Sequence, residues 1–179
     1  MRVLVVYYSR TGTTARFASM IAGEFGADLE TIRCPACASG IPGAFRALGT
    51  CLGGHPPEIL PTRINPANYE LLILGTPVWA FSLAAPLRAW LAVRGRNLPA
   101  CAAFATASAA GFRSTFAAIE TLTGQTLRAT LAITAEDICA GREHLATLRF
   151  ADTLRETTTR LWRHAPPRAA HRHETFLGW

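Results

Sequence analysis

The 179-residue sequence contains no lysine, so all 18 of its basic residues are arginines. A Walker-type nucleotide loop needs a lysine, and the G-x-G-x-x-G fingerprint of dinucleotide-binding proteins is also missing. Nucleotide binding through either of these two loops is therefore excluded. We attribute the all-arginine usage to genome composition rather than to function.

Long hydrophobic runs are absent as well. The apolar run from Val3 to Tyr8 is far too short to cross a bilayer or to form the core of a signal peptide. Only 17% of the residues are charged and half are hydrophobic, which excludes a disordered chain and allows a substantial core. We expect a cytoplasmic protein with one domain over residues 1–165 and a basic extension over residues 166–179.

The five cysteines are an odd number in a sequence without an export signal, so we expect reduced thiols rather than a disulfide framework. Cys34, Cys37, Cys51 and His55 have the spacing C-x2-C-x13-C-x3-H. This spacing is compatible with a tetrahedral zinc site, and its C-x-x-C with a redox dithiol. The third interpretation is that the cysteines are incidental small apolar residues of a loop insertion. We adopt it as the working one, so no metal ligand is assigned.

The net charge is +6, and half of it lies in the last twenty residues, where Arg160, Arg163, Arg168 and Arg172 face only Glu174. A basic tail can attract nucleic acid, acidic proteins or anionic lipid. The body of the chain, however, shows no interleaving of aromatic and basic residues that would form an RNA-binding platform. A nucleic-acid partner is therefore not expected.

Short apolar segments alternate with helical patterns along the chain. Strands are expected at residues 2–8, 27–32, 69–76, 100–107 and within 126–138, and helices at 13–26, 82–95, 112–122 and 141–162. This alternation predicts an α/β domain with a doubly wound parallel sheet of five strands and helices on both faces. Residues 33–68 interrupt the pattern and are interpreted as an elaborated connection with a short helix near 43–52.

Two helices carry predictions about their buried faces. In the helix at 13–26, Phe17, Ile21 and Phe25 form one apolar stripe, and Gly26 is the expected stop. The inward face of the helix at 141–162 is predicted to consist of Leu145, Leu148, Ala151 and Leu154.

Ligands of open parallel sheets bind beyond the carboxyl ends of the strands, which here directs attention to residues 9–14, 77–83 and 107–111. The first of these loops reads Ser9-Arg10-Thr11-Gly12-Thr13-Thr14 and leads into a helix. A helix N-terminus holds anions, Gly12 allows a tight turn, and the hydroxyl groups can donate hydrogen bonds to a phosphate. The alternative is a Ser/Thr turn that only caps the helix.

The first loop resembles the phosphate loop of flavodoxins, S/T-x-T-G-x-T, through Ser9, Thr11, Gly12 and Thr14. Two further segments resemble flavodoxin-family proteins in the same order. "LLILGTPVWAFSLAAPLRAWL" is similar to their "GTPVW" loop and the helix that follows, and "FATASAAGFRSTFAAIETL" is similar to their third loop. The resemblance covers roughly residues 1–160.

This resemblance implies a flavodoxin-like three-layer fold with strand order 2-1-3-4-5 and bound FMN. The residues implied to hold the 5′-phosphate are Ser9, Arg10, Thr11, Gly12, Thr13 and Thr14. One side of the isoalloxazine ring would be lined by Thr76, Pro77, Val78, Trp79 and Ala80, with Trp79 as the stacking residue. The other side or the pyrimidine edge would be approached by Thr106, Ala107, Ser108, Ala109, Ala110 and Gly111. No catalytic side chain is implied.

The sequence also departs from the family pattern. Its third loop lacks the tyrosine that stacks on the ring in many flavodoxins, and it has alanines where related proteins often have glycines. The chain is basic, whereas carrier flavodoxins are typically acidic. Three hypotheses follow: an FMN-binding electron-transfer protein with a redox partner protein or a small-molecule acceptor, an FMN-dependent NAD(P)H:quinone-type reductase, and a cofactor-free interaction module.

Overall fold

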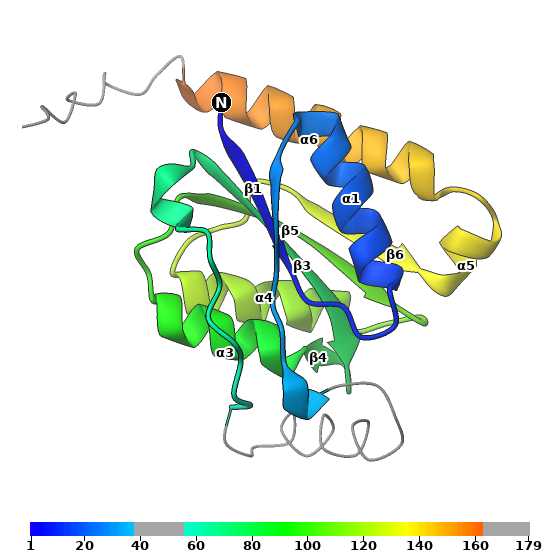
Figure 1. Cartoon of the computed structure of the whole chain (residues 1–179). Helices are drawn as coiled ribbons and strands as arrows, with labels where there is room; N and C mark the ends of the chain where they lie inside the picture. Colours follow the sequence, from blue (N-terminus) through cyan, green and yellow to red (C-terminus); the bar gives the residue numbers. More distant parts are fainter. Residues whose placement is uncertain (38–55, 163–179) are drawn as a thin grey trace, which may run out of the picture.

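The protein is a sheet covered by helices on both faces (Figure 1). The computed structural model describes residues 1–37 and 56–162. The strands are β1 (Val3–Tyr7), β2 (Asp28–Thr31), β3 (Leu71–Trp79), β4 (Ser82–Leu83), β5 (Ala100–Ala107) and β6 (Thr130–Thr134). The α-helices are α1 (Thr13–Phe25), α3 (Ala85–Arg94), α4 (Phe112–Thr123), α5 (Ala135–Cys139) and α6 (Glu143–Trp162). Single 3-10 turns are η1 (Pro35–Cys37) and η2 (Pro66–Asn68).

The five main strands are parallel and follow the order β2-β1-β3-β5-β6. This confirms the predicted strand order, because β6 is the fifth of the predicted strands. The two-residue β4 lies off this path and pairs antiparallel with the end of β3. Helices α1 and α6 cover one face of the sheet, and α3 and α4 cover the other (Figure 1).

The central strands are buried on both faces, which explains why their sequences are apolar throughout. Along β1, Val3 and Val5 belong to one core cluster, while Leu4 and Val6 belong to the other. This alternation is the two-residue period of a strand. The first cluster includes Phe17 of α1 and the second includes Trp90 of α3, so each face is closed by the helices that lie on it.

Two local predictions are wrong in part. The predicted helix at 82–95 begins only at Ala85, because its first two residues form β4. For α6 the predicted Ala151 and Leu154 are buried, but the rest of the buried face is Thr147 and Phe150, while Leu148 is only partly buried and Leu145 is 52% exposed. Leu145 precedes Thr147 by two residues, which places it about 200° around the helix axis.

Other predictions lie outside the described residues or are confirmed by them. The short helix near 43–52 and the extension at 166–179 are outside the described ranges. Helix α1 ends at Phe25 with Gly26 in the left-handed conformation that the predicted stop requires. Within residues 1–37 and 56–162, no helix combines the length and the apolar character that crossing a membrane requires.

Gly75 in β3 should not tolerate a side chain. A Cβ there would meet the Phe104 ring and would lie 2.9 Å from Cβ of Tyr7. We expect Gly75→Ala to lower the free energy of unfolding by about 1–3 kcal/mol through overpacking, as measured by urea denaturation. The control is Gly23→Ala in α1, where a Cβ meets nothing within 4 Å and stability should rise by up to about 1 kcal/mol. Equal stability of Gly75→Ala and wild type would contradict this packing.

Candidate functional site

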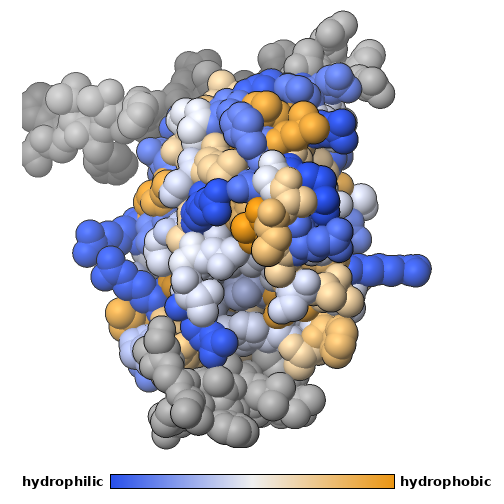
Figure 2. Space-filling model, turned by 90° about the vertical axis from the view of Figure 1, so that its right-hand side faces the viewer, coloured by the Kyte–Doolittle hydropathy of each residue, from blue (hydrophilic) through white to orange (hydrophobic). Residues whose placement is uncertain are grey.

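A cavity of about 280 Å³ opens at the carboxyl ends of the parallel strands, where the three predicted loops meet. It is lined by Arg10, Thr11, Thr13, Thr14, Pro77, Val78, Trp79, Thr106, Ala107, Ser108, Ala135 and Ile138. All of these except Ala135 and Ile138 belong to the predicted site residues. Viewed from the side of α5 and α6, the surface has a hollow bordered mainly by residues of intermediate hydropathy (Figure 2).

The first loop forms a compact turn at the start of α1. Gly12 has a φ of 95°, and its amide donates a hydrogen bond of 3.1 Å to Oγ of Ser9. The Gly12 carbonyl accepts the first helical bond from the amide of Arg16 at 2.9 Å. No side chain caps the helix. Ser9 and Gly12 therefore shape the turn without lining the cavity, while Thr11, Thr13 and Thr14 border it.

Thr14 and Thr106 join the first loop to the third. Their hydroxyl oxygens lie 2.9 Å apart in a hydrogen bond, and both residues are buried. This bond ties the first turn of α1 to the end of β5. The two side chains consequently fix the relative position of two cavity walls, in addition to bordering the cavity themselves.

Trp79, at the end of β3, forms the aromatic part of the cavity wall. The ring of Tyr8 packs against it nearly at a right angle, with the ring centroids 5.4 Å apart. The guanidinium carbon of Arg10 lies 5.9 Å from the ring centroid of Trp79, which is a cation–π contact. Trp79 is half-buried, so its ring is held by neighbours while part of it stays accessible.

A tight hairpin joins β3 to β4 beside this wall. Ala80 and Phe81 form its two-residue turn, and both have positive φ, at 47° and 57°. Such a turn normally uses Gly, Asn or Asp. Gly111 allows the third loop to pack against the hairpin, because a Cβ there would lie 2.6 Å from Val78 Cγ1 and 2.8 Å from Phe81 Cα. The Ser114 hydroxyl also donates a hydrogen bond to the Phe81 carbonyl.

Several predicted site residues do not line the cavity. Thr76 is fully buried, and its hydroxyl donates to the Pro77 carbonyl at 2.9 Å. Ala80 and Gly111 support the hairpin. From the third loop, Ala107 and Ser108 reach the cavity, whereas Ala109 and Ala110 are exposed and are not among its lining residues.

No protein-family model and no curated protein matches the sequence, but solved structures do. The flavoprotein of Lactobacillus acidophilus NCFM in complex with FMN is similar with a TM-score of 0.65 and 23% identity, covering 78% of this chain and 97% of that one. The flavodoxin, WrbA-like protein of Agrobacterium tumefaciens has a TM-score of 0.58 and 18% identity, covering 88% and 98%. This chain has the flavodoxin-like fold.

A third similar structure is the apo form of the NADH:FMN oxidoreductase EmoB, with a TM-score of 0.52 and 16% identity. The match covers 86% of this chain and 90% of that one. All three sequence identities are low, so these similarities establish only the flavodoxin-like fold. The chemistry of the protein has to be inferred from the residues of the cavity.

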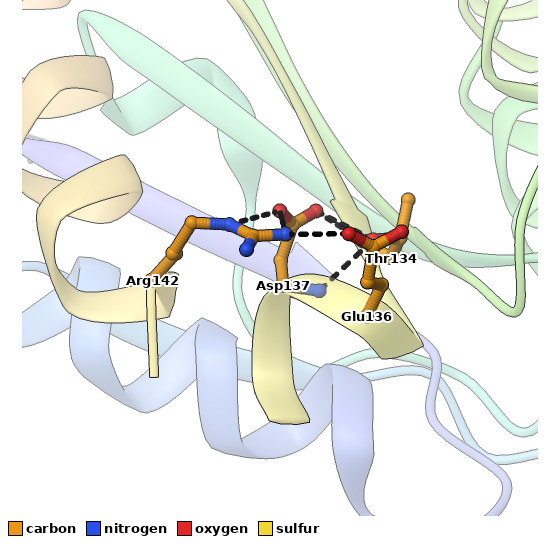
Figure 3. Close-up of polar contacts among 4 residues, drawn as sticks. All are labelled: Thr134, Glu136, Asp137 and Arg142. Atoms are coloured by element: carbon orange, nitrogen blue, oxygen red, sulfur yellow. Dashed lines mark hydrogen bonds and ion pairs between the residues drawn. The ribbon is translucent and has the colours of Figure 1, made fainter. Parts of the chain in front are cut away.

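The lining residues that sequence analysis missed, Ala135 and Ile138, belong to the short helix α5. Thr134 and Asp137 form a capping box at its start: the Asp137 amide donates to the Thr134 hydroxyl at 3.0 Å, and the Thr134 amide donates to the carboxylate at 3.0 Å. Arg142 closes the network from the other end of the helix with bonds to Asp137 and Glu136 (Figure 3). The sequence pattern Thr-x-x-Asp, which is typical of a helix N-terminus, could have predicted where this helix begins.

The Asp137 carboxylate is stabilised in its charged form. The hydroxyl and amide of Thr134, together with the guanidinium of Arg142, lower the pKa of Asp137 to about 2, from an ordinary value of 3.8. The hydrogen bonds to Thr134 are the largest cause. The charged carboxylate thus fixes α5, and with it the wall formed by Ala135 and Ile138.

The expectation of reduced thiols is wrong for one pair of cysteines. Cys34 and Cys37 form a disulfide, because the turn between them brings their Cα atoms to 5.2 Å. A disulfide offers no thiolate to a metal, and the described residues hold no group of three metal-ligating side chains. Cys51 and His55 lie outside the described residues.

The Asp137 network predicts a specific acid dependence of stability. Because the folded-state pKa lies below the unfolded value, the network stabilises the protein fully above about pH 3.8, and this contribution is lost as the pH falls toward 2. Asp137→Asn should therefore lose less thermal stability than wild type between pH 5 and pH 2.5, as followed by circular dichroism. Glu136→Gln, which leaves the capping box in place, serves as the control and should keep the wild-type dependence. Identical acid profiles of Asp137→Asn and wild type would argue against the network.

Proposed function

We propose that this flavodoxin-like protein binds FMN in the cavity and acts in electron transfer. The proposal rests on one observation: the N-terminus of α1, which no side chain caps, and the half-buried ring of Trp79 border the same cavity. The similar structure from L. acidophilus, which is a complex with FMN, supports the same ligand.

The lining residues suit the phosphate end of FMN. The first turn of a helix presents amide groups without intrahelical partners and a partial positive charge, which together favour an anion. Thr11 and Thr13 add hydroxyl donors, and Arg10 adds a positive charge. No carboxylate is among the described residues that line the cavity, so none of them would repel a phosphate.

The ring end of FMN would lie beside Trp79 and Pro77, with Ala107 and Ser108 contributed by the third loop. FMN supplies the redox chemistry when bound, and the protein orients it and sets its electrostatic environment. Tyr8 and Arg10 hold Trp79 in place, so the aromatic wall is positioned before a ligand arrives.

Reductase activity is the second candidate, in which NAD(P)H reduces the bound FMN and a quinone or another small acceptor reoxidises it. The third loop favours this candidate, because the side chains by which it lines the cavity, those of Thr106, Ala107 and Ser108, are all small and none is aromatic. A ring left uncovered by an aromatic side chain on that side can admit a nicotinamide. The similarity to an NADH:FMN oxidoreductase is compatible with this activity.

Titration with FMN and with riboflavin separates the two ends of the proposed site. Thr11→Ala should weaken FMN binding about tenfold, since it removes one hydrogen bond to a charged group, and should leave riboflavin binding unchanged. Trp79→Ala should weaken the binding of both ligands. Dissociation constants from flavin fluorescence quenching, together with the visible absorption spectrum of the purified protein, provide the measurement.

Thr153→Ala is the matched control, because Thr153 lies exposed on α6 and its hydroxyl donates to the Arg149 carbonyl of the same helix. A colourless protein that takes up no added FMN would reject the proposal and favour the cofactor-free module. Equal losses of FMN and riboflavin affinity in Thr11→Ala would reject the assignment of the phosphate end.

The carrier and the reductase differ in steady-state turnover. The FMN-loaded reductase should oxidise NADPH continuously in the presence of a quinone, and Trp79→Ala should slow this turnover by weakening FMN binding. The loss of NADPH absorbance reports the rate. A flavin-loaded protein without turnover would remain a carrier.

A further inference from the structure

The turn that carries Cys34 and Cys37 follows β2 and lies at the same edge of the sheet as β4 (Figure 1). The two sulfur atoms are joined in a disulfide. The Cys37 amide also donates a backbone hydrogen bond of 3.0 Å to the Cys34 carbonyl. The turn is thus closed twice, once by the backbone and once by the side chains.

This disulfide contributes little to holding the fold together. A cross-link stabilises a protein mainly by restricting the unfolded chain, and the restriction is small when the closed loop is short. Here the cysteines are separated by three positions. Because the backbone hydrogen bond also closes the turn, opening the disulfide need not unfold it but removes one of its two restraints. The C-x-x-C spacing is that of dithiols that interconvert between these states.

A chain of contacts leads from this turn to the cavity. The Tyr8 hydroxyl donates a hydrogen bond of 3.2 Å to the Cys37 carbonyl. The ring of Tyr8 packs nearly at a right angle against that of Trp79, which lines the cavity. Tyr8 is 4% exposed, and burial raises the pKa of its hydroxyl, so the hydroxyl remains a neutral donor.

We propose that Cys34 and Cys37 are a thiol-responsive modification site, at which a dithiol compound reversibly opens the disulfide and thereby alters the Trp79 wall of the cavity through Tyr8. The effect on FMN rests on the proposed function, whereas the effect on Trp79 does not. Opening the bond frees the Cys37 backbone to shift, and the Tyr8 hydroxyl follows its acceptor.

The exchange balances as a two-electron transfer. A thiolate of the dithiol attacks Sγ of Cys34, the more exposed of the two at 7% against 2%, and Cys37 leaves as a thiolate that takes up a proton. The second thiol of the compound then attacks its own sulfur in the mixed disulfide and releases Cys34 as a thiol. The compound ends as a disulfide, and oxidation of the pair is the reverse reaction.

Two other described cysteines provide an internal comparison. Burial raises the pKa of the Cys101 thiol to about 12, which makes it a poor nucleophile. Cys139 is an exposed free cysteine on α5. Cys139→Ser therefore removes the most accessible free thiol of the described residues without touching the proposed site.

The test uses the full chain in mixtures of reduced and oxidised dithiothreitol. Alkylation followed by peptide mass mapping should show Cys34 and Cys37 joined in the oxidised mixture and both alkylated in the reduced one. Tryptophan fluorescence should change along with the thiol count, and Trp79→Phe should abolish that change. Wild type and Cys139→Ser should behave alike.

Two variants test the connection to the cavity. In wild type, the dissociation constant of FMN should differ about fivefold or more between the two mixtures, which is the lower end of typical coupling between sites. Cys34→Ser/Cys37→Ser should show one affinity in both mixtures. Tyr8→Phe keeps the ring against Trp79 but removes the hydrogen bond to the Cys37 carbonyl. In this variant the disulfide of Cys34 and Cys37 should still open, while the tryptophan fluorescence and the FMN affinity should be the same in both mixtures.

Three outcomes would overturn the proposal: thiols that stay free in the oxidised mixture, a disulfide that the reduced mixture leaves closed, or fluorescence that is the same in both states. Equal FMN affinity in the two states of wild type would overturn the coupling to the ligand. If no FMN binds at all, the proposed function fails. Peptide mapping still decides whether the dithiol opens the disulfide, and fluorescence still decides whether the surroundings of Trp79 change when it opens.

Discussion

Parallel pairing of β1, β3 and β5 is the constraint on which the site depends. In this register Tyr7 lies beside Gly75, Gly75 beside Phe104, and Pro77 beside Thr106. Parallel strands end at the same edge, so the loops that follow them must meet there. The fit of the Phe104 ring over Gly75 requires the glycine. A packing detail in the middle of the sheet therefore supports the arrangement of loops at its end.

The hydrogen bond between Thr14 and Thr106 shows how this constraint reaches the cavity. One hydroxyl belongs to the first turn of α1 and the other to the last residues of β5. Their meeting at 2.9 Å depends on the strand order, since β3 alone separates β1 from β5. A second link, the ion pair of Arg16 with Glu143 at 2.8 Å, joins α1 to α6 at the surface. The first turn of α1 is thus tied both to the end of β5 and to α6.

The sequence was sufficient to predict the elements whose patterns are long. The five strands and the helix stripe of Phe17 and Ile21 follow from hydrophobic periodicity, because both faces of the sheet are covered. The cavity-lining loops followed from the strand-to-helix junctions and the resemblance to flavodoxins. Their assignment as ligand contacts stays a prediction, since the structure shows where the residues lie and the FMN titrations test what they hold.

Short elements escaped prediction because few residues determine them. The turn at Ala80 and Phe81 has none of the residues that signal a hairpin, and it packs so closely against Gly111 that a side chain at that position would collide with it. Helix α5 has five residues, too few for a periodic stripe, yet its capping box was readable at Thr134 and Asp137. The pairing of Cys34 with Cys37 depends on a turn that the periodic patterns do not encode.

The charge of the cavity bears on the kind of redox protein proposed here. Arg10 is the one charged residue among the described residues that line it, and it lies against the Trp79 ring. A positive charge beside a bound flavin stabilises its anionic reduced form and so raises the reduction potential. The carrier flavodoxins that the sequence resembles are acidic, whereas this chain carries a net charge of +6. The electrostatics therefore favour a protein that accepts electrons readily over one that delivers them at low potential.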